Sequence, residues 1–198
     1  MKLHHLVIAS MASHAVGTGT APLDTVLKEL DNSVVSSPLL QHDLLTNLAS
    51  GAYGDMNLAY RIFAANHYVY SRNFARYLQI VLDKVSDEQI GAPIEENMAE
   101  EDGNYEEEDL VLMEQHGIKR AWFDKIPHKL LSKRFIEGVG LKNETVSMDS
   151  PGGRFTNYMI DMYGSSTACE ALAVIGFAIE QTVSTMYQFV WDGAPAHT

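Results

Sequence analysis

The sequence predicts an all-α protein, a bundle of about seven helices, and three observations support this. Apolar residues recur at the three- and four-residue spacing of a helix face, and no segment shows the strict alternation of a strand. Prolines and glycines stand mostly between these segments. The chain has 198 residues, of which 46% are apolar, enough for one domain with a buried core. We therefore expect one helical domain over residues 21–198, after a loose leader over residues 1–20.

Prolines, glycines and apolar spacing place the helices of the N-terminal half. Pro22 is expected in the first turn of a helix that runs to about Asn32. Ser37 and Pro38 begin a second helix, which the Gly51–Gly54 stretch ends. A long third helix follows. Its aromatic-rich face comprises Met56, Tyr60, Phe63, His67, Tyr70, Phe74, Tyr77 and Val81.

An acidic segment separates this half from the next. Asp87 or Ser86 is expected to cap a helix that runs to about Glu101. Residues 100–109 then contain seven acidic side chains, which favours a solvated loop or the start of a helix. A short helix is expected over Leu110–Phe123.

Breaks and caps place the remaining helices. Pro127 begins a helix that ends near Gly140. The Ser150–Gly153 stretch predicts a break, followed by a helix over about Arg154–Met162. The Gly164–Thr167 segment then begins the last helix, which is expected to run almost to the end of the sequence.

Charge and cysteine content exclude some classes of function. The formal net charge of −12 disfavours nucleic acids and anionic membrane surfaces as partners. Cys169 is the single cysteine, so an intrachain disulfide is excluded and a reducing, cytoplasmic location is expected. The apolar Met1–Ser10 stretch is too short to span a membrane and has no clear cleavage site of a signal peptide. The dinucleotide fingerprint, the P-loop and paired-cysteine zinc spacings do not occur in the sequence.

Glu180 is the first candidate for chemistry, because it is the sole charged residue between Ala171 and Trp191. Burying a carboxylate in an apolar helix is costly unless a charge or hydrogen bonds compensate. A metal ion would do so. A hydrogen bond from Tyr, Ser or Lys of a neighbouring helix, or protonation of the carboxyl group, would also do so.

Four further side chains are candidates for a metal site, each with a structural alternative. Glu101 ends a helix beside the acidic segment, where a carboxylate is usually solvated. His128 and His116 could be ligands or surface histidines. His67 could support a metal-bound carboxylate or be a core residue of the aromatic face. Carboxylates and imidazoles from separate helices of a bundle build the sites of iron and manganese proteins.

Two residues of the last helix have a simpler interpretation. Thr167 and Glu170 match a capping box, in which the glutamate reaches back to the helix cap. Cys169 is interpreted as a small buried core residue, although a helix N-terminus can activate a thiol as a nucleophile.

Four segments in order resemble the heme-oxygenase-like diiron oxidases and oxygenases, a superfamily that includes thiaminase II and pyrroloquinoline-quinone synthase. The segments are Phe63–Phe74, Glu96–Gly103, Pro127–Leu141 and Ala171–Glu180. The resemblance implies a heme-oxygenase-like bundle and non-heme iron, one or two ions, held by Glu101, His128 and Glu180. It also implies an oxidoreductase that acts with dioxygen on a small organic substrate, with Phe63, His67, Tyr70 and His116 near the site.

The chain departs from this family in two respects. The segment between Glu101 and His128 is longer than usual, which leaves His116 as a rival ligand. A further helix with a His-Asp-His ligand group is expected to be missing after Trp191, and the apolar groove this leaves predicts a homodimer. Two alternatives stay open: a degenerate, non-catalytic homologue that binds or oligomerises, and a metal-free enzyme of the thiaminase II or quinone-synthase kind.

Overall fold

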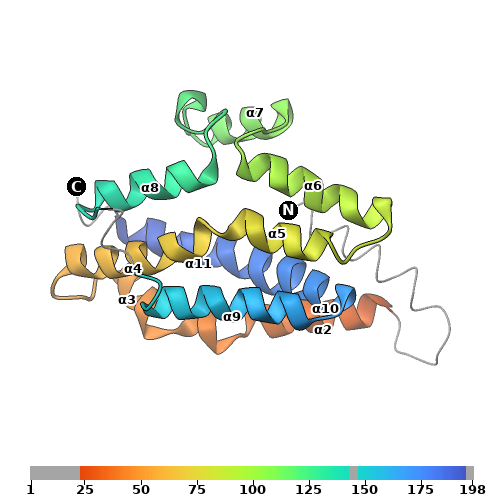
Figure 1. Cartoon of the computed structure of the whole chain (residues 1–198). Helices are drawn as coiled ribbons and strands as arrows, with labels where there is room; N and C mark the ends of the chain where they lie inside the picture. The colour runs from red at the N-terminus through yellow and green to blue at the C-terminus, as the bar shows by residue number, and fades with distance from the viewer. Residues whose placement is uncertain (1–22, 143–146, 195–198) are drawn as a thin grey trace. The chain divides into compact units, whose positions relative to one another are not determined.

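Every element of the computed structural model is helical (Figure 1). The structure describes residues 23–142 and 147–194, and no strand occurs within those two ranges. The all-α prediction is therefore confirmed, and the expected leader at residues 1–20 lies outside the described residues. Within the same ranges, no helix has the length and apolar character needed to cross a bilayer.

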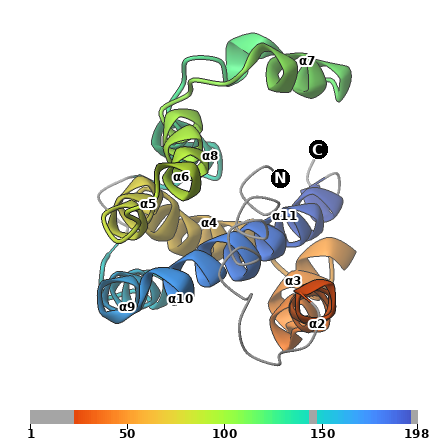
Figure 2. The same cartoon turned by 90° about the vertical axis from the view of Figure 1, so that its right-hand side faces the viewer.

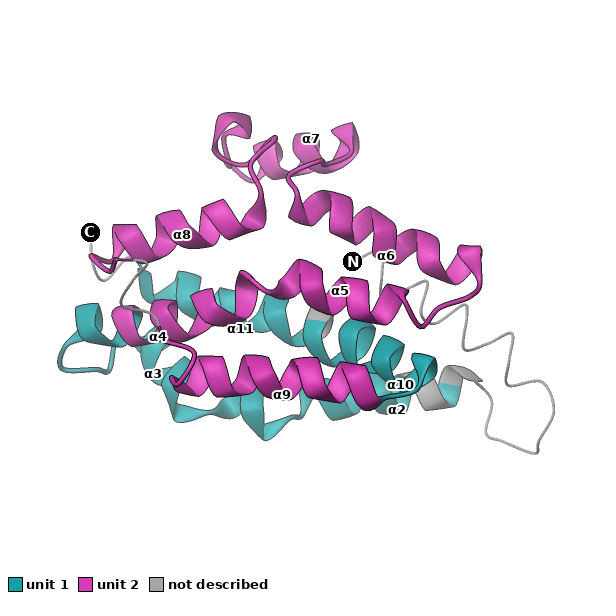
Figure 3. Ribbon diagram, in the orientation of Figure 1, with its two compact units in different colours: residues 1–60, 166–198 teal, residues 61–165 magenta. Residues whose placement is uncertain are grey.

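The chain divides into two compact units (Figure 3). Unit 1 combines residues 1–60 with residues 166–198, and unit 2 is the continuous segment 61–165. Helix α4 (Met56–Ser71) begins in unit 1 and continues into unit 2. The expected single domain over residues 21–198 stays a prediction.

Unit 1 is built by α11 packing on α3, with α2 beside it. The Tyr60 hydroxyl at the start of α4 donates a hydrogen bond to the Val190 carbonyl of α11 at 2.8 Å. Its core is formed by buried leucines of the N-terminal part and apolar residues near residue 175. Its other elements are α2 (Leu23–Val35), η1 (Pro38–Gln41), α3 (Asp43–Ser50), α10 (Ala168–Ala173), the π-helix η4 (Val174–Ile179) and α11 (Glu180–Gly193).

The helix predicted from Ser37 and Pro38 is interrupted at His42. Residue 42 has an extended backbone, and its Nδ1 accepts a hydrogen bond from the Leu44 N–H at 3.1 Å, which caps α3. A histidine is not among the usual N-cap residues, so the sequence did not indicate this break. Gly51 ends α3 in the left-handed conformation, as its position predicted.

Unit 2 contains the rest of α4 and the helices that follow it. In two views, α4 and α5 lie between α9 on one side and α6 with α8 on the other (Figures 1 and 2). The short helix α7 projects from the ends at which α6 and α8 meet (Figure 2). The elements are α5 (Phe74–Leu82), α6 (Glu88–Glu101), α7 (Glu107–Gln115), η2 (Arg120–Trp122), α8 (His128–Gly138) and α9 (Pro151–Ser165).

The long helix predicted from Met56 to Val81 is wrong in one respect, because it breaks between α4 and α5. Asn73 turns its side chain back, and its Nδ2 donates to the Val69 carbonyl at 2.7 Å. Such a local side-chain bond competes with the helical ladder. The apolar face nevertheless continues across the break, with Tyr70 and Tyr77 rings 5.4 Å apart.

The break predicted at residues 150–153 is wrong in its extent, because α9 begins at Pro151 and not near Arg154. The Gly152 N–H donates to Oδ1 of Asn66 in α4 at 2.7 Å. A Cβ at residue 152 would lie 2.3 Å from the Asn66 carbonyl oxygen, so the glycine permits this close approach of two helices. The glycines that look like a break in the sequence are thus a packing surface.

Two predicted caps are confirmed, and one prediction of burial is wrong. The Asp87 side chain accepts from the Gln89 N–H at 2.8 Å and begins α6. Thr167 and Glu170 form the expected capping box of α10. Cys169, expected in the core, is exposed, because it faces outward in the first turn of this short helix.

Candidate functional site

The acidic turn after α6 holds Glu101 at the end of that helix. The Gly103 N–H donates to the Glu100 carbonyl at 2.8 Å, and the Asn104 N–H donates to the Ala99 carbonyl at 2.9 Å. Gly103 has φ of 84°, the left-handed conformation that ends helices in this motif. The turn fixes the direction in which the chain leaves Glu101.

A backbone contact ties this turn to the segment that precedes α8. The Lys125 N–H donates to the Gly103 carbonyl at 2.9 Å, and the Lys125 ammonium donates to the Asn104 side chain at 3.3 Å. A Cβ at Gly103 would lie 2.5 Å from the Ile126 nitrogen, so the two segments touch at this glycine. Pro127 occupies the position before α8, and His128 is the first residue of that helix.

These ties bring Glu101 and His128 into direct contact. Oε1 of Glu101 lies 2.6 Å from Nδ1 of His128. The Glu101 side chain exposes 12% of its surface to solvent, and the His128 side chain exposes 35%. Two residues 27 positions apart, both predicted from the sequence as site residues, therefore form one polar pair.

The other ring nitrogen of His128 bonds to Tyr105, a residue that the sequence analysis missed. The Tyr105 hydroxyl lies within hydrogen-bonding distance of Nε2. Its ring packs edge-on against the buried Phe123, with centroids 5.6 Å apart. Burial, with a further effect of the Glu101 and Glu100 charges, raises the pKa of Tyr105 to about 12, so the phenol stays protonated at neutral pH.

Tyr105 was hidden by its surroundings in the sequence. It lies in the segment of residues 100–109, whose seven acidic side chains predicted a solvated loop. The segment is instead mixed: Gly103 is buried and Tyr105 is half-buried, while Glu106, Glu107 and Glu108 are exposed. The signal that could have found Tyr105 is one aromatic ring among carboxylates directly after a predicted site glutamate.

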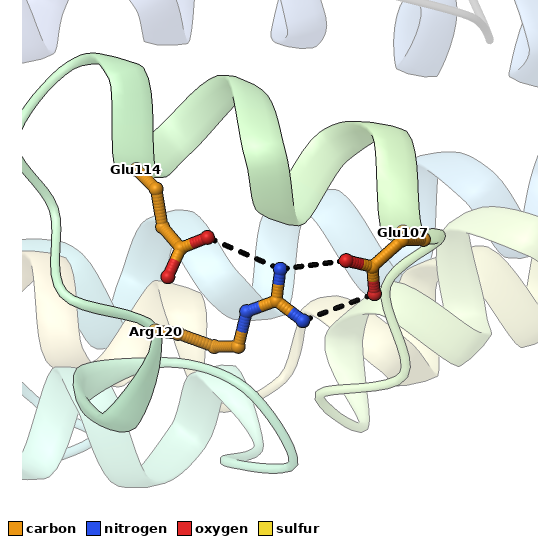
Figure 4. A network of polar contacts seen from close by, with 3 residues as sticks. All are labelled: Glu107, Glu114 and Arg120. Carbon is orange, nitrogen blue, oxygen red and sulfur yellow. Dashed lines mark hydrogen bonds and ion pairs between the residues drawn. The ribbon is translucent and has the colours of Figure 1, made fainter.

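The chain between Glu101 and His128 forms an excursion from the neighbouring helices α6 and α8. Hydrogen bonds between charged side chains on the surface link its two parts. Predicted as one helix over Leu110–Phe123, it consists of α7 and the short helix η2. The Arg120 guanidinium donates two hydrogen bonds to Glu107, at 2.7 and 3.0 Å, and one to Glu114 at 3.1 Å (Figure 4). His116, the rival ligand, is an exposed residue at the end of α7.

The predicted pocket residues Phe63, His67 and Tyr70 share the aromatic face of α4. The His67 ring stacks on Phe63 at 5.5 Å and lies 6.3 Å from the Tyr70 ring. Phe63 also meets Phe135 of α8, at 6.4 Å, so this face packs on the helix that carries His128. Burial lowers the pKa of His67 to about 4, which makes it a neutral imidazole at neutral pH.

Glu180 is the first residue of α11 and directly follows the π-helix η4. Its side chain lies outside the described part of the structure. π-helical turns are rare and are frequent at functional sites. The residue that the sequence singled out therefore lies directly after a π-helical turn.

The described side chains include no group of three or more His, Cys, Asp or Glu placed to hold a metal ion. The structure brings Glu101 and His128 together and adds Tyr105. The assignment of Glu101, His128 and Glu180 as metal ligands stays a prediction. Comparisons of the chain with family models, with curated proteins and with solved structures found no match.

Proposed function

We propose that this protein is a non-heme iron-dependent oxidoreductase that acts with dioxygen on a small organic substrate. The observation that supports it best is the 2.6 Å contact between the Glu101 carboxylate and the His128 imidazole. The pair comes from two helices and is held by a backbone tie, as expected for preorganised ligands.

The donor chemistry of this pair fits iron. One carboxylate oxygen and one imidazole nitrogen are ligands that iron and manganese accept in bundle proteins. Glu101 and His128 would hold the ion, since each offers a donor atom of this kind and the two side chains lie together. When bound, ferrous iron would supply the electrons for dioxygen chemistry.

The residues around the pair have separable roles in this proposal. Glu101 and His128 bind the cation, and Tyr105 and Phe123 exclude water from one side of the imidazole. Glu180 is proposed as a third ligand on sequence grounds and on the π-helix that precedes it.

Anaerobic titration of the purified protein with ferrous iron against a competing chelator tests the proposal. We expect Glu101→Gln and His128→Gln to weaken binding by at least about tenfold, since each removes one ligand. Glu180→Gln tests the third ligand in the same way.

The matched controls are His116→Gln and Glu137→Gln, which alter an exposed histidine and an exposed glutamate in the same unit. Both should bind iron as the wild type does. Iron that is substoichiometric in the wild type and unaffected by Glu101→Gln and His128→Gln would refute the proposal and leave the degenerate or metal-free alternatives. A loss caused by His116→Gln alone would instead transfer the site to His116.

A further inference from the structure

Both nitrogens of His128 are engaged, and the two partners differ in what they can do. Glu101 offers a carboxylate, which accepts hydrogen bonds, so in a neutral imidazole Nδ1 carries the proton. Nε2 is then an acceptor, and the Tyr105 hydroxyl donates to it. A hydroxyl can accept a hydrogen bond as well as donate one, whereas an ionised carboxylate can only accept.

We propose that Tyr105 is a positioning residue that holds His128 in either tautomer, donating to Nε2 when the site is metal-free and accepting from Nε2–H when a cation occupies Nδ1. This inference rests on the proposed function. When a cation takes the Nδ1 lone pair, the imidazole proton is relocated from Nδ1 to Nε2 through solvent. The number of protons on the neutral ring is unchanged, and the Tyr105 O–H turns away so that its oxygen accepts.

Two features suit Tyr105 to this role. Its hydroxyl lies on the side of the ring opposite Glu101, so it does not compete for Nδ1. The edge-on contact with Phe123 fixes the phenol ring while leaving the hydroxyl hydrogen free to rotate.

The opposite arrangement makes the opposite prediction. If a cation bound Nε2, with Glu101 as the hydrogen-bonding partner behind it, Tyr105 would compete with the metal. Removing the hydroxyl would then tighten binding. The sign of the change in affinity therefore decides between the two arrangements.

The test uses the full-length protein and Zn²⁺, a diamagnetic probe for the divalent site. Isotope-edited NMR of the labelled ring nitrogens of His128 should show the proton on Nδ1 without metal and on Nε2 with Zn²⁺. A chelator competition should show Zn²⁺ binding weakened about tenfold by Tyr105→Phe, the range found when a hydrogen-bonding partner of a metal-bound histidine is removed. Tyr158→Phe, which removes an exposed hydroxyl elsewhere in the same unit, should stay within about twofold of the wild type.

Each result has a clear reading. Unchanged or tighter Zn²⁺ binding by Tyr105→Phe overturns the inference, as does an equal loss in Tyr158→Phe. A metal-free wild type with no preference for the Nδ1–H tautomer also overturns it, and that measurement needs no variant to fold. A wild type that binds no metal but loses its Nδ1–H preference on Tyr105→Phe refutes the proposed function and the metal-bound half of the inference, while supporting the donor role of Tyr105.

Discussion

Unit 2 contains two pairings of a glutamate with a basic side chain that lie close in sequence and differ in environment. The Glu101–His128 pair has 12% and 35% of its side-chain surface exposed, and an aromatic residue covers the far side of the imidazole. The Glu107–Arg120 pair has 69% and 34% exposed and lies on the α7 excursion (Figure 4). Both have short, well-aligned contacts, so distance alone does not distinguish them.

The difference lies in what fixes each pair and in how far each glutamate is removed from water. Glu101 and His128 end and begin helices whose connecting segments are tied through the Gly103 and Lys125 backbones. Glu107 and Arg120 meet through long side chains on the surface. Exposed ion pairs contribute little to stability because solvent screens them, whereas a desolvated polar pair strongly affects its neighbours. The first pair is therefore the better candidate for chemistry.

The largest effect should come from breaking the backbone contact that holds the partly buried Glu101–His128 pair. Gly103→Ala adds a Cβ 2.5 Å from the Ile126 nitrogen, at a residue with φ of 84°. The left-handed conformation costs an alanine about 1–2 kcal/mol, and overpacking costs a further 1–3 kcal/mol or so. Urea denaturation should therefore show a loss of about 2–5 kcal/mol in the free energy of unfolding.

Gly117→Ala is the matched control for this change. Gly117 has a similar φ of 80°, but a Cβ there would have nothing within 4 Å. It should lose only the conformational part, about 1–2 kcal/mol. Equal losses in the two variants would show that the contact between Gly103 and Ile126 does not hold the site.

The second-largest effect should come from His67, and it tests whether burial controls the protonation of a side chain. Its pKa is about 4 in the folded protein and about 6.5 in the unfolded chain, because burial disfavours the imidazolium. The unfolded state therefore binds more protons between these values. Stability that is present above pH 6.5 is lost as the pH falls towards 4, by up to about 3 kcal/mol.

His67→Phe should remove this part of the pH dependence, because phenylalanine keeps the stack on Phe63 and cannot be protonated. The measurement is the free energy of unfolding at several pH values, in the wild type and the variant. His116→Phe, at an exposed position, should leave the pH dependence as it is in the wild type. Parallel curves for wild type and His67→Phe would mean that His67 is not desolvated.

Local chemistry explains which parts of the fold the sequence predicted. The caps at Asp87 and Thr167 depend on residues within three positions of each other, so their sequence patterns suffice. The start of α9 depends on Asn66, 86 positions away, which no local pattern reveals. The break at Asn73 depends on a rotamer that turns a side chain onto its own helix.

The candidate site divides in the same way. Glu101 and His128 were chosen by residue type and by the order of motifs in the resemblance, which carries long-range information. Tyr105 was missed because its acidic neighbours describe the average solvation of the segment, whereas burial is decided residue by residue. Cys169 shows the reverse error, since a small apolar residue type does not determine which way a short helix faces.

The smallest effect should come from the exposed pair. Arg120→Gln removes the bonds to both Glu107 and Glu114. The guanidinium lowers the pKa of Glu107 through its hydrogen bonds, but both groups are solvated, so the urea midpoint should move only slightly. The small shift should also shrink at high salt, which screens exposed charges. Iron binding should not change, because the variant leaves the Gly103–Lys125 tie intact. A large, salt-independent loss of stability, or a loss of iron binding, would mean that the excursion and the partly buried Glu101–His128 pair form one cooperative structure, and the contrast between the two regions would not hold.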